Sequence, residues 1–134
     1  MKIIIDSQDK ISSMAASMIA EHAKAKPGCA MAFAAGRTTK KVYDALTAMN
    51  IKELAECKAF TVCEYEGLEA GDTRSCAYRL NEELYSKAGI TQIFTPNAEN
   101  ADKFDAEIEE CGGIELAVLR GVHHVRIVNP DHRP

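Results

Sequence analysis

The clearest candidate for chemistry in this sequence is a turn of small and polar residues at positions 34–39, which read AAGRTT. The turn follows an apolar run at residues 29–33 and precedes a helical pattern, so it would connect a strand to a helix. The first N–H groups of a helix lack partners within the helix and carry partial positive charge, which favours bound anions. The turn therefore predicts a phosphate-binding site.

Four residues of this turn would form the phosphate site. Gly36 allows a close approach of the backbone to a ligand, and the Arg37 guanidinium can make two hydrogen bonds to a phosphate. Thr38 and Thr39 add hydroxyl groups. The alternative interpretation is a plain turn, in which a threonine caps the helix and Arg37 lies on the surface. The turn matches neither G-x-x-x-x-G-K-[ST] nor G-x-G-x-x-G, so it does not specify a nucleotide.

Strand and helix patterns alternate along most of the chain. Short apolar runs predict strands at residues 3–5, 29–33, 59–63, 91–94 and 114–119. Apolar residues at helical spacing predict helices at residues 8–25, 42–49, 77–89 and 101–111. This alternation indicates the α/β class, with one domain over residues 1–134 and a doubly wound, mainly parallel sheet that carries helices on both faces. Ligands bind at the carboxyl ends of strands in such sheets, which is where the turn at 34–39 would lie.

Composition narrows the classes of partner and of cofactor. The chain has a net charge of -4 and no dense basic cluster, which argues against a nucleic-acid partner. No apolar run approaches the ~20 residues that cross a membrane, so we expect no membrane contact and a cytoplasmic location. The five cysteines are an odd number without a C-x-x-C motif, which favours reduced thiols. We expect no cofactor and no metal; the alternative metal site would combine Cys57, Cys63, Cys111, His123 and His124, whose spacing matches no zinc pattern.

The last stretch, residues 120–134, differs from the rest of the chain in composition. It holds three of the four histidines and one short apolar run at 125–128, which predicts a further strand. A sheet that ends there would leave an exposed edge. Either a partner such as a second copy of the chain covers this edge, in a homo-oligomer, or the chain is a fragment of a longer fold. A role in protein interaction through this edge is an alternative to catalysis.

Several segments carry a family resemblance. Residues 33–39, FAAGRTT, are similar to the pattern L-A-T-G-S-T-P, and residues 60–68, FTVCEYEGL, are similar to F-N-x-D-E-Y-x-G-L. Residues 75–84 fit S-Y-x-Y-x-x-N-E-x-L in part, and residues 112–116 fit G-G-I-D-L. In this order and spacing they resemble the glucosamine-6-phosphate deaminase family, which shares its fold with the 6-phosphogluconolactonases. The resemblance covers nearly all of residues 1–119.

The resemblance implies an isomerase and deaminase that converts glucosamine 6-phosphate to fructose 6-phosphate and ammonia without a cofactor. The turn around Gly36 would hold the phosphate of this small phosphorylated sugar, and the acid of the D-E-Y motif would transfer the proton. The family fold is about twice as long as this chain and is often oligomeric. The chain would thus be the N-terminal half of the family fold, truncated relative to the family.

The departures from the family pattern fall on the chemistry. Cys63 occupies the position of the catalytic Asp, and an ordinary thiol is only a minor fraction thiolate at neutral pH. Glu64 is adjacent, but neighbours on a strand point to opposite faces. His124 is the candidate for the family histidine, a suitable general acid or base near neutral pH. The candidate catalytic residues are therefore Cys63, Glu64 and His124, in an active site that is degenerate.

Three functions follow from the resemblance. The first is an amino-sugar-phosphate isomerase/deaminase with weak or no activity, because the catalytic acid is replaced. The second is a non-catalytic protein that binds a phosphosugar or retains only a structural role. The third is a hydrolase similar to 6-phosphogluconolactonase, which Tyr65 argues against because that family has Arg at the corresponding place.

Overall fold

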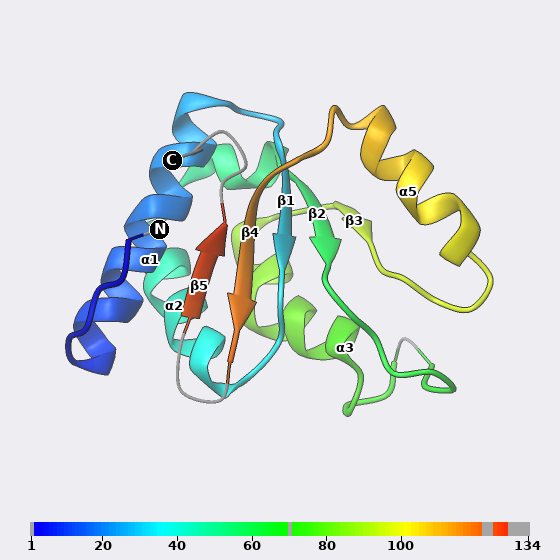
Figure 1. Cartoon of the computed structure of the whole chain (residues 1–134), viewed down its shortest axis with the longest axis horizontal. Coiled ribbons are helices and arrows are strands. Elements are labelled where there is room, and N and C mark those ends of the chain that lie inside the picture. The colour runs from blue at the N-terminus through cyan, green and yellow to red at the C-terminus, as the bar shows by residue number, and fades with distance from the viewer. Residues whose placement is uncertain (1, 70, 122–124, 129–134) are drawn as a thin grey trace.

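A five-stranded sheet forms the centre of the molecule in the computed structural model of the chain (Figure 1). The structure describes residues 2–69, 71–121 and 125–128. The strands lie in the order β3-β2-β1-β4-β5. Their bounds are Ala30–Phe33 for β1, Lys58–Thr61 for β2, Gln92–Phe94 for β3, Ile114–Arg120 for β4 and Val125–Val128 for β5.

The central strand β1 runs parallel to both of its neighbours, β2 and β4. Strand β3 is parallel to β2, and only the edge strand β5 is antiparallel, to β4. The chain proceeds from β1 outward to β2 and β3, then returns to β4 on the other side of β1. This confirms the predicted α/β class with a mainly parallel, doubly wound sheet. The strand order reverses between β1 and β4, the position where such sheets bind ligands.

The helices match the predicted apolar patterns closely. They are α1 (Gln8–Ala25), α2 (Arg37–Ala48), the 3-10 helix η1 (Lys52–Glu56), the continuous helix formed by α3 (Cys76–Leu80), η2 (Asn81–Tyr85) and α4 (Ser86–Ala88), and α5 (Ala101–Glu110). Ser7 caps α1 by accepting a hydrogen bond from the backbone of Lys10. Gly89 ends α4 in the left-handed region, with φ of 73°. The segment η2 is a π-helical turn, which apolar spacing alone does not reveal.

Two apolar cores lie on opposite faces of the sheet. The larger core joins α1, α2 and the α3–α4 helix to one face, where the buried Phe33 ring contacts Tyr43 and Tyr85 edge to face. On the other face, Phe60 stacks on Phe94 with ring centroids 4.6 Å apart and meets the α5 residue Phe104. Alternate residues of β1 point into the two cores, as a strand that is buried on both faces requires.

Two strand predictions need correction. The run Ile3–Ile5 forms no strand; Ile3 is 74% exposed and Ile5 is 92% exposed. The segment lies beside α1 rather than beside a strand (Figure 1), so its backbone has no ladder to join. The strand predicted at 59–63 ends at Thr61, which leaves Cys63 beyond the sheet.

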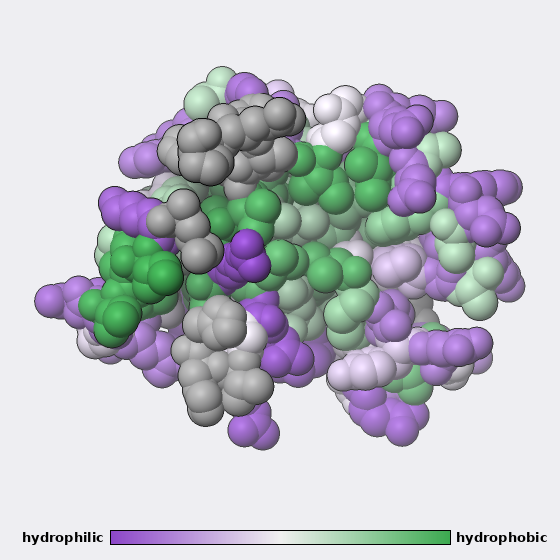
Figure 2. All heavy atoms as spheres, in the orientation of Figure 1, coloured by the Kyte–Doolittle hydropathy of each residue, from purple (hydrophilic) through white to green (hydrophobic). Residues whose placement is uncertain are grey.

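The isoleucines of this N-terminal segment contribute to an apolar area on the surface. Figure 2 shows hydrophobic atoms gathered over the N-terminal segment and α1. Exposed apolar side chains in these two elements are Ile3, Ile4, Ile5, Met14 and Met18.

In the part of the chain that the structure describes, no helix is at once long enough and apolar enough to cross a bilayer.

Candidate functional site

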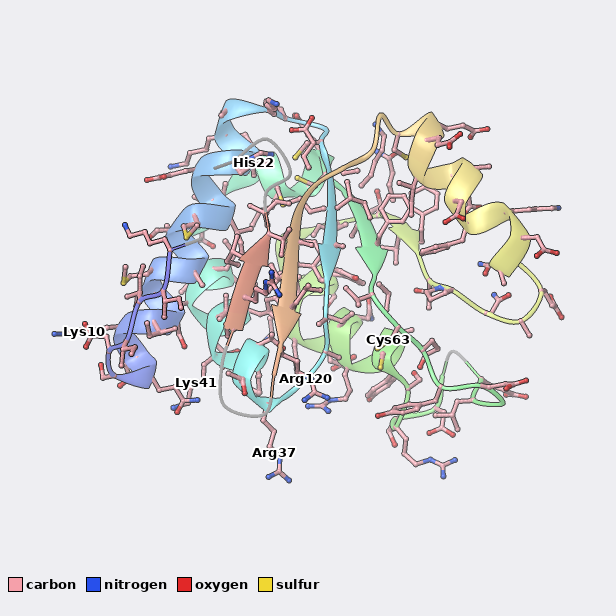
Figure 3. All side chains as sticks on the ribbon, in the orientation of Figure 1. Lys10, His22, Arg37, Lys41, Cys63 and Arg120 are labelled. Atoms are coloured by element: carbon pink, nitrogen blue, oxygen red, sulfur yellow. The ribbon has the colours of Figure 1, made fainter. Side chains whose placement is uncertain are left out.

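Several candidate site residues lie at the edge of the sheet where the parallel strands end. Figure 3 shows Arg37, Cys63 and Arg120 at this edge, which is the lower one in the view. Arg37 opens α2 directly after the turn that follows β1, Cys63 follows β2, and Arg120 is the last residue of β4. The candidate site is therefore built from three adjacent strands, at the point where the strand order reverses.

Buried hydroxyl groups of α2 donate hydrogen bonds to the turn after β1. The Thr39 hydroxyl donates to the carbonyl oxygens of Ala34 and Gly36, at 3.0 and 3.2 Å. The Tyr43 hydroxyl also donates to the Ala34 oxygen, at 2.5 Å. Burial raises the pKa of Tyr43 well above its usual value, so this group remains a neutral donor. Hydrogen bonds from side chains of α2 thus fix the turn that precedes this helix.

The four residues predicted to bind phosphate differ in their exposure. Gly36 is the N-cap of α2, and no side chain caps the helix there, so its first N–H groups depend on other partners. Arg37 is exposed and points away from the sheet (Figure 3), and Thr38 is half-buried. Thr39 is fully buried and its hydroxyl donates within the turn. The geometry therefore gives Thr39 a supporting role, whereas Arg37 is exposed and Thr38 is half-buried.

Arg120 is a site residue that the sequence prediction missed. Its Nε donates to the Ala35 carbonyl oxygen at 2.7 Å, and its side chain lies so close to Gly36 that a Cβ there would overlap Arg120 Cδ and Nε. The open approach predicted at Gly36 is therefore filled by this side chain. An arginine directly after the apolar run 114–119 was the available signal, but sequence spacing does not show that it reaches a turn more than eighty residues away.

Cys63 lies just past the end of β2 and is exposed. The backbone N–H of Val62 donates to the Phe33 oxygen at 3.0 Å, which keeps this segment beside the turn that follows β1. Beneath it, the buried Thr61 hydroxyl contacts the hydroxyls of Tyr85 and Thr95, each at 3.1 Å. Cys63 is therefore exposed to solvent, and hydrogen bonds of the preceding residues Thr61 and Val62 hold the chain in place beside it.

Glu64 serves as a cap for another helix. Its carboxylate accepts from the backbone N–H groups of Cys76 and Ala77, both at 2.8 Å, and from that of Tyr65 at 2.9 Å. Negative charge is favourable at a helix N-terminus, and these bonds satisfy donors that the helix cannot. Because Glu64 lies beyond the strand, the alternation predicted for it does not apply. Its carboxylate is engaged in structure, which leaves Cys63 as the accessible candidate for proton transfer.

This geometry predicts the effect of Glu64→Ala. Removing the carboxylate leaves the first N–H groups of α3 without a hydrogen-bond acceptor, so we expect the free energy of unfolding to fall by about 1–2 kcal/mol. Urea unfolding followed by circular dichroism measures this change. The matched control is Glu66→Ala, which removes an exposed carboxylate from the same loop. Equal stability of the two variants would contradict the capping role.

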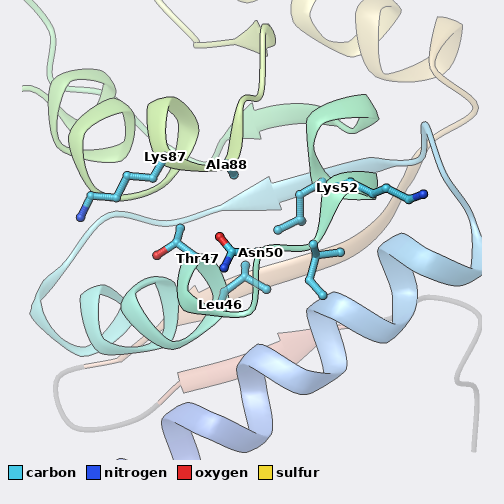
Figure 4. A pocket seen from close by; sticks show the side chains of 8 residues that line it. Leu46, Thr47, Asn50, Lys52, Lys87 and Ala88 are labelled. Carbon is cyan, nitrogen blue, oxygen red and sulfur yellow. The ribbon is translucent and has the colours of Figure 1, made fainter.

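Other features of the chain lie outside this edge. His124 and His123 are not among the described residues. Within the ranges that the structure does describe, no group of three or more His, Cys, Asp or Glu is placed to hold a metal ion. A shallow cavity of about 200 Å³ lies between Leu46, Asn50 and Ala88 (Figure 4). It is at the C-terminal end of α2, opposite the candidate site, because α2 runs antiparallel to the strands.

Solved structures share this fold. A monomeric glucosamine-6-phosphate deaminase aligns over 93% of the chain with a TM-score of 0.80 and 21% identity. A 6-phosphogluconolactonase from Thermotoga maritima aligns over 92% with a TM-score of 0.70 and 19% identity. The chain covers 58% and 60% of these two proteins. The chain therefore has the same α/β fold as the corresponding part of these two proteins.

Sequence relatives narrow this class. A glucosamine-6-phosphate deaminase of Clostridium beijerinckii is 27% identical over 96% of the chain, and one of Clostridium perfringens is 31% identical over 87%. No family model matches the sequence. The chain is a relative of the glucosamine-6-phosphate deaminases, as its motifs indicated. It spans somewhat more than half the length of these proteins, namely 59% and 53%.

Proposed function

We propose that the chain binds the phosphate group of a small phosphorylated sugar at the turn between β1 and α2. The observation that carries this proposal is the uncapped N-terminus of α2, which lies beside two arginines at the point where the strand order reverses. The relationship to the glucosamine-6-phosphate deaminases supports the same ligand class. The amino sugar named by these relatives, glucosamine 6-phosphate, is the proposed ligand.

In this proposal the phosphate meets the backbone N–H groups of Arg37 and Thr38 and the two guanidinium groups. The Arg120 Nε donates to the Ala35 oxygen, which holds the guanidinium group beside the turn, and the residue is exposed to solvent. The first turn of α2 contains no acidic residue that would repel an anion. The positive charge of the arginines, the free N–H donors and the position at the start of α2 all favour the binding of a phosphate monoester.

We further propose that Cys63 stands where a proton is moved on the sugar, in a deaminase-like reaction that releases ammonia. A thiol stands where the relatives' pattern has a carboxylate, and the neighbouring Glu64 carboxylate is held by α3, so the expected turnover is weak. Binding without turnover is the second candidate function, and the engagement of Glu64 favours it. His124 would complete the predicted catalytic set and lies outside the described residues.

Two measurements on the same protein separate these functions. We expect glucosamine 6-phosphate to raise the melting temperature, and glucosamine without phosphate to leave it unchanged, because the phosphate provides the main contact. Ammonia release, measured with a coupled assay, then distinguishes a weak deaminase from a binding protein. Absence of any thermal shift at millimolar sugar phosphate would contradict the proposed function. The cytoplasmic location and a homo-oligomer through the sheet edge stay predictions.

A further inference from the structure

We propose that Cys63 and Cys76 form a reversible disulfide bond when the protein meets a small oxidised disulfide such as glutathione disulfide. Cys63 lies on the loop after β2, and Cys76 is the first residue of α3. The structure contains both as free thiols. The bond would tie the loop of the candidate site to the helix that supports it.

The Glu64 cap brings the two cysteines together. Its carboxylate accepts from the backbone N–H groups of Cys76 and Ala77, both at 2.8 Å, so the residue next to Cys63 is anchored on the first turn of α3. Burial, then the neighbouring Cys63 thiol and the Glu64 carboxylate, raise the pKa of Cys76 to about 11. Because Cys63 directly precedes the anchored Glu64, its thiol lies near Cys76 at the start of α3. A disulfide requires such proximity of the two residues.

Exposure assigns different roles to the two thiols. Cys63 is exposed and can meet an oxidant in solution, whereas Cys76 is only 8% exposed. Cys63 is therefore the attacking thiol, and Cys76 is the resolving thiol, which acts within the molecule and needs no access from solvent. A second cysteine pair, Cys29 and Cys57, directly precedes the paired strands β1 and β2, and both of its members are buried, so it lacks an exposed thiol for the first step.

The chemistry is a pair of thiol–disulfide exchanges. The Cys63 thiolate attacks one sulfur of glutathione disulfide, which forms a mixed disulfide and releases one glutathione thiolate. Cys76 loses its proton to water, and its thiolate then attacks the Cys63 sulfur and releases the second glutathione. The two protein thiols lose two electrons and two protons, and glutathione disulfide is reduced to two molecules of glutathione. Excess reduced thiol reverses both steps.

Oxidation would also act on the candidate site. The disulfide removes the only thiol that we propose for proton transfer, so it would abolish ammonia release; this consequence rests on the proposed function. The disulfide itself does not, because it depends only on where the two cysteines lie. A count of thiols therefore tests the inference even if the protein binds no sugar.

The test is to incubate the folded protein with glutathione disulfide, alkylate it under denaturing conditions, and identify linked peptides by mass spectrometry. We expect the alkylated thiols to fall from five to three, with one peptide pair joined through Cys63 and Cys76, and to return to five after dithiothreitol. Cys111→Ser is the matched control, because this cysteine lies at the end of α5, and it should lose two thiols in the same way.

The variants Cys76→Ser and Cys63→Ser separate the two steps. Cys76→Ser should retain glutathione on Cys63 as a stable adduct, whereas Cys63→Ser should keep all of its remaining thiols. Linkage in the unaltered protein decides the matter even if a variant fails to fold. A lasting glutathione adduct on Cys63 of the unaltered protein, or a bond between Cys29 and Cys57 instead, would overturn the inference.

Discussion

Phe33→Ala is expected to lower the free energy of unfolding by about 3–5 kcal/mol, because it empties a buried ring position at the end of β1. The Phe33 side chain is fully buried and meets Tyr43 at 6.0 Å and Tyr85 at 6.2 Å between ring centroids. Tyr43 in turn donates to the Ala34 oxygen at the base of the turn. The loss should therefore weaken the candidate site as well as the core. Chemical unfolding monitored by circular dichroism gives the change.

Two further variants make this prediction specific. Phe33→Leu keeps most of the volume and should cost less than about 1.5 kcal/mol. Tyr65→Ala removes an aromatic ring that is 60% exposed and should change stability by less than about 0.5 kcal/mol. A loss below about 1 kcal/mol for Phe33→Ala would mean that the ring does not fill the core as described.

Gly36→Ala is the second change with a large expected effect. The new methyl group would overlap the Arg120 side chain, so Arg120 must swing away and give up its bond to the Ala35 oxygen. Loss of a hydrogen bond to a charged donor costs about 1.5–3 kcal/mol, and we expect the stability to fall by about this amount. We also expect the affinity for sugar phosphate to fall at least tenfold, because the displaced guanidinium no longer faces the turn.

A double-mutant cycle isolates this contact. In the Arg120→Gly background the hydrogen bond is already absent, so Gly36→Ala should cost less there by about 1 kcal/mol or more. The two stability changes are measured by urea unfolding under the same conditions. If Gly36→Ala lowers the stability by the same amount in both backgrounds, the Arg120 side chain does not contact Gly36 as described.

The elements of the fold were predictable where burial alone decides them. Helix α1 begins after the cap Ser7 and ends at Ala25, shortly before Pro27-Gly28, and β1 is an apolar run of the length that a buried strand requires. The run Ile3–Ile5 is also apolar but has no neighbouring strand to pair with and is exposed. An apolar run thus favours a strand. Whether a neighbouring strand is present to complete its hydrogen bonds depends on the tertiary structure.

The candidate site was predictable in position but not in its supporting contacts. The turn around Gly36 could be found because small and polar residues separate a strand pattern from a helix pattern. The contact of Arg120 with Ala35 and the cap that Glu64 forms on α3 join residues far apart in the chain, and neither leaves a local pattern. The family pattern gave Glu64 a catalytic role and gave Arg120 none, and the three-dimensional contacts show that both residues support the site.

Backbone amide chemical shifts test most directly whether the turn between β1 and α2 receives a sugar phosphate. On addition of glucosamine 6-phosphate to the 15N-labelled protein, we predict shifts of the Gly36, Arg37 and Thr38 amides that saturate with concentration and are absent with glucosamine. Saturating shifts confined to other parts of the chain, or no shifts at millimolar ligand, would contradict binding of the sugar phosphate at this turn.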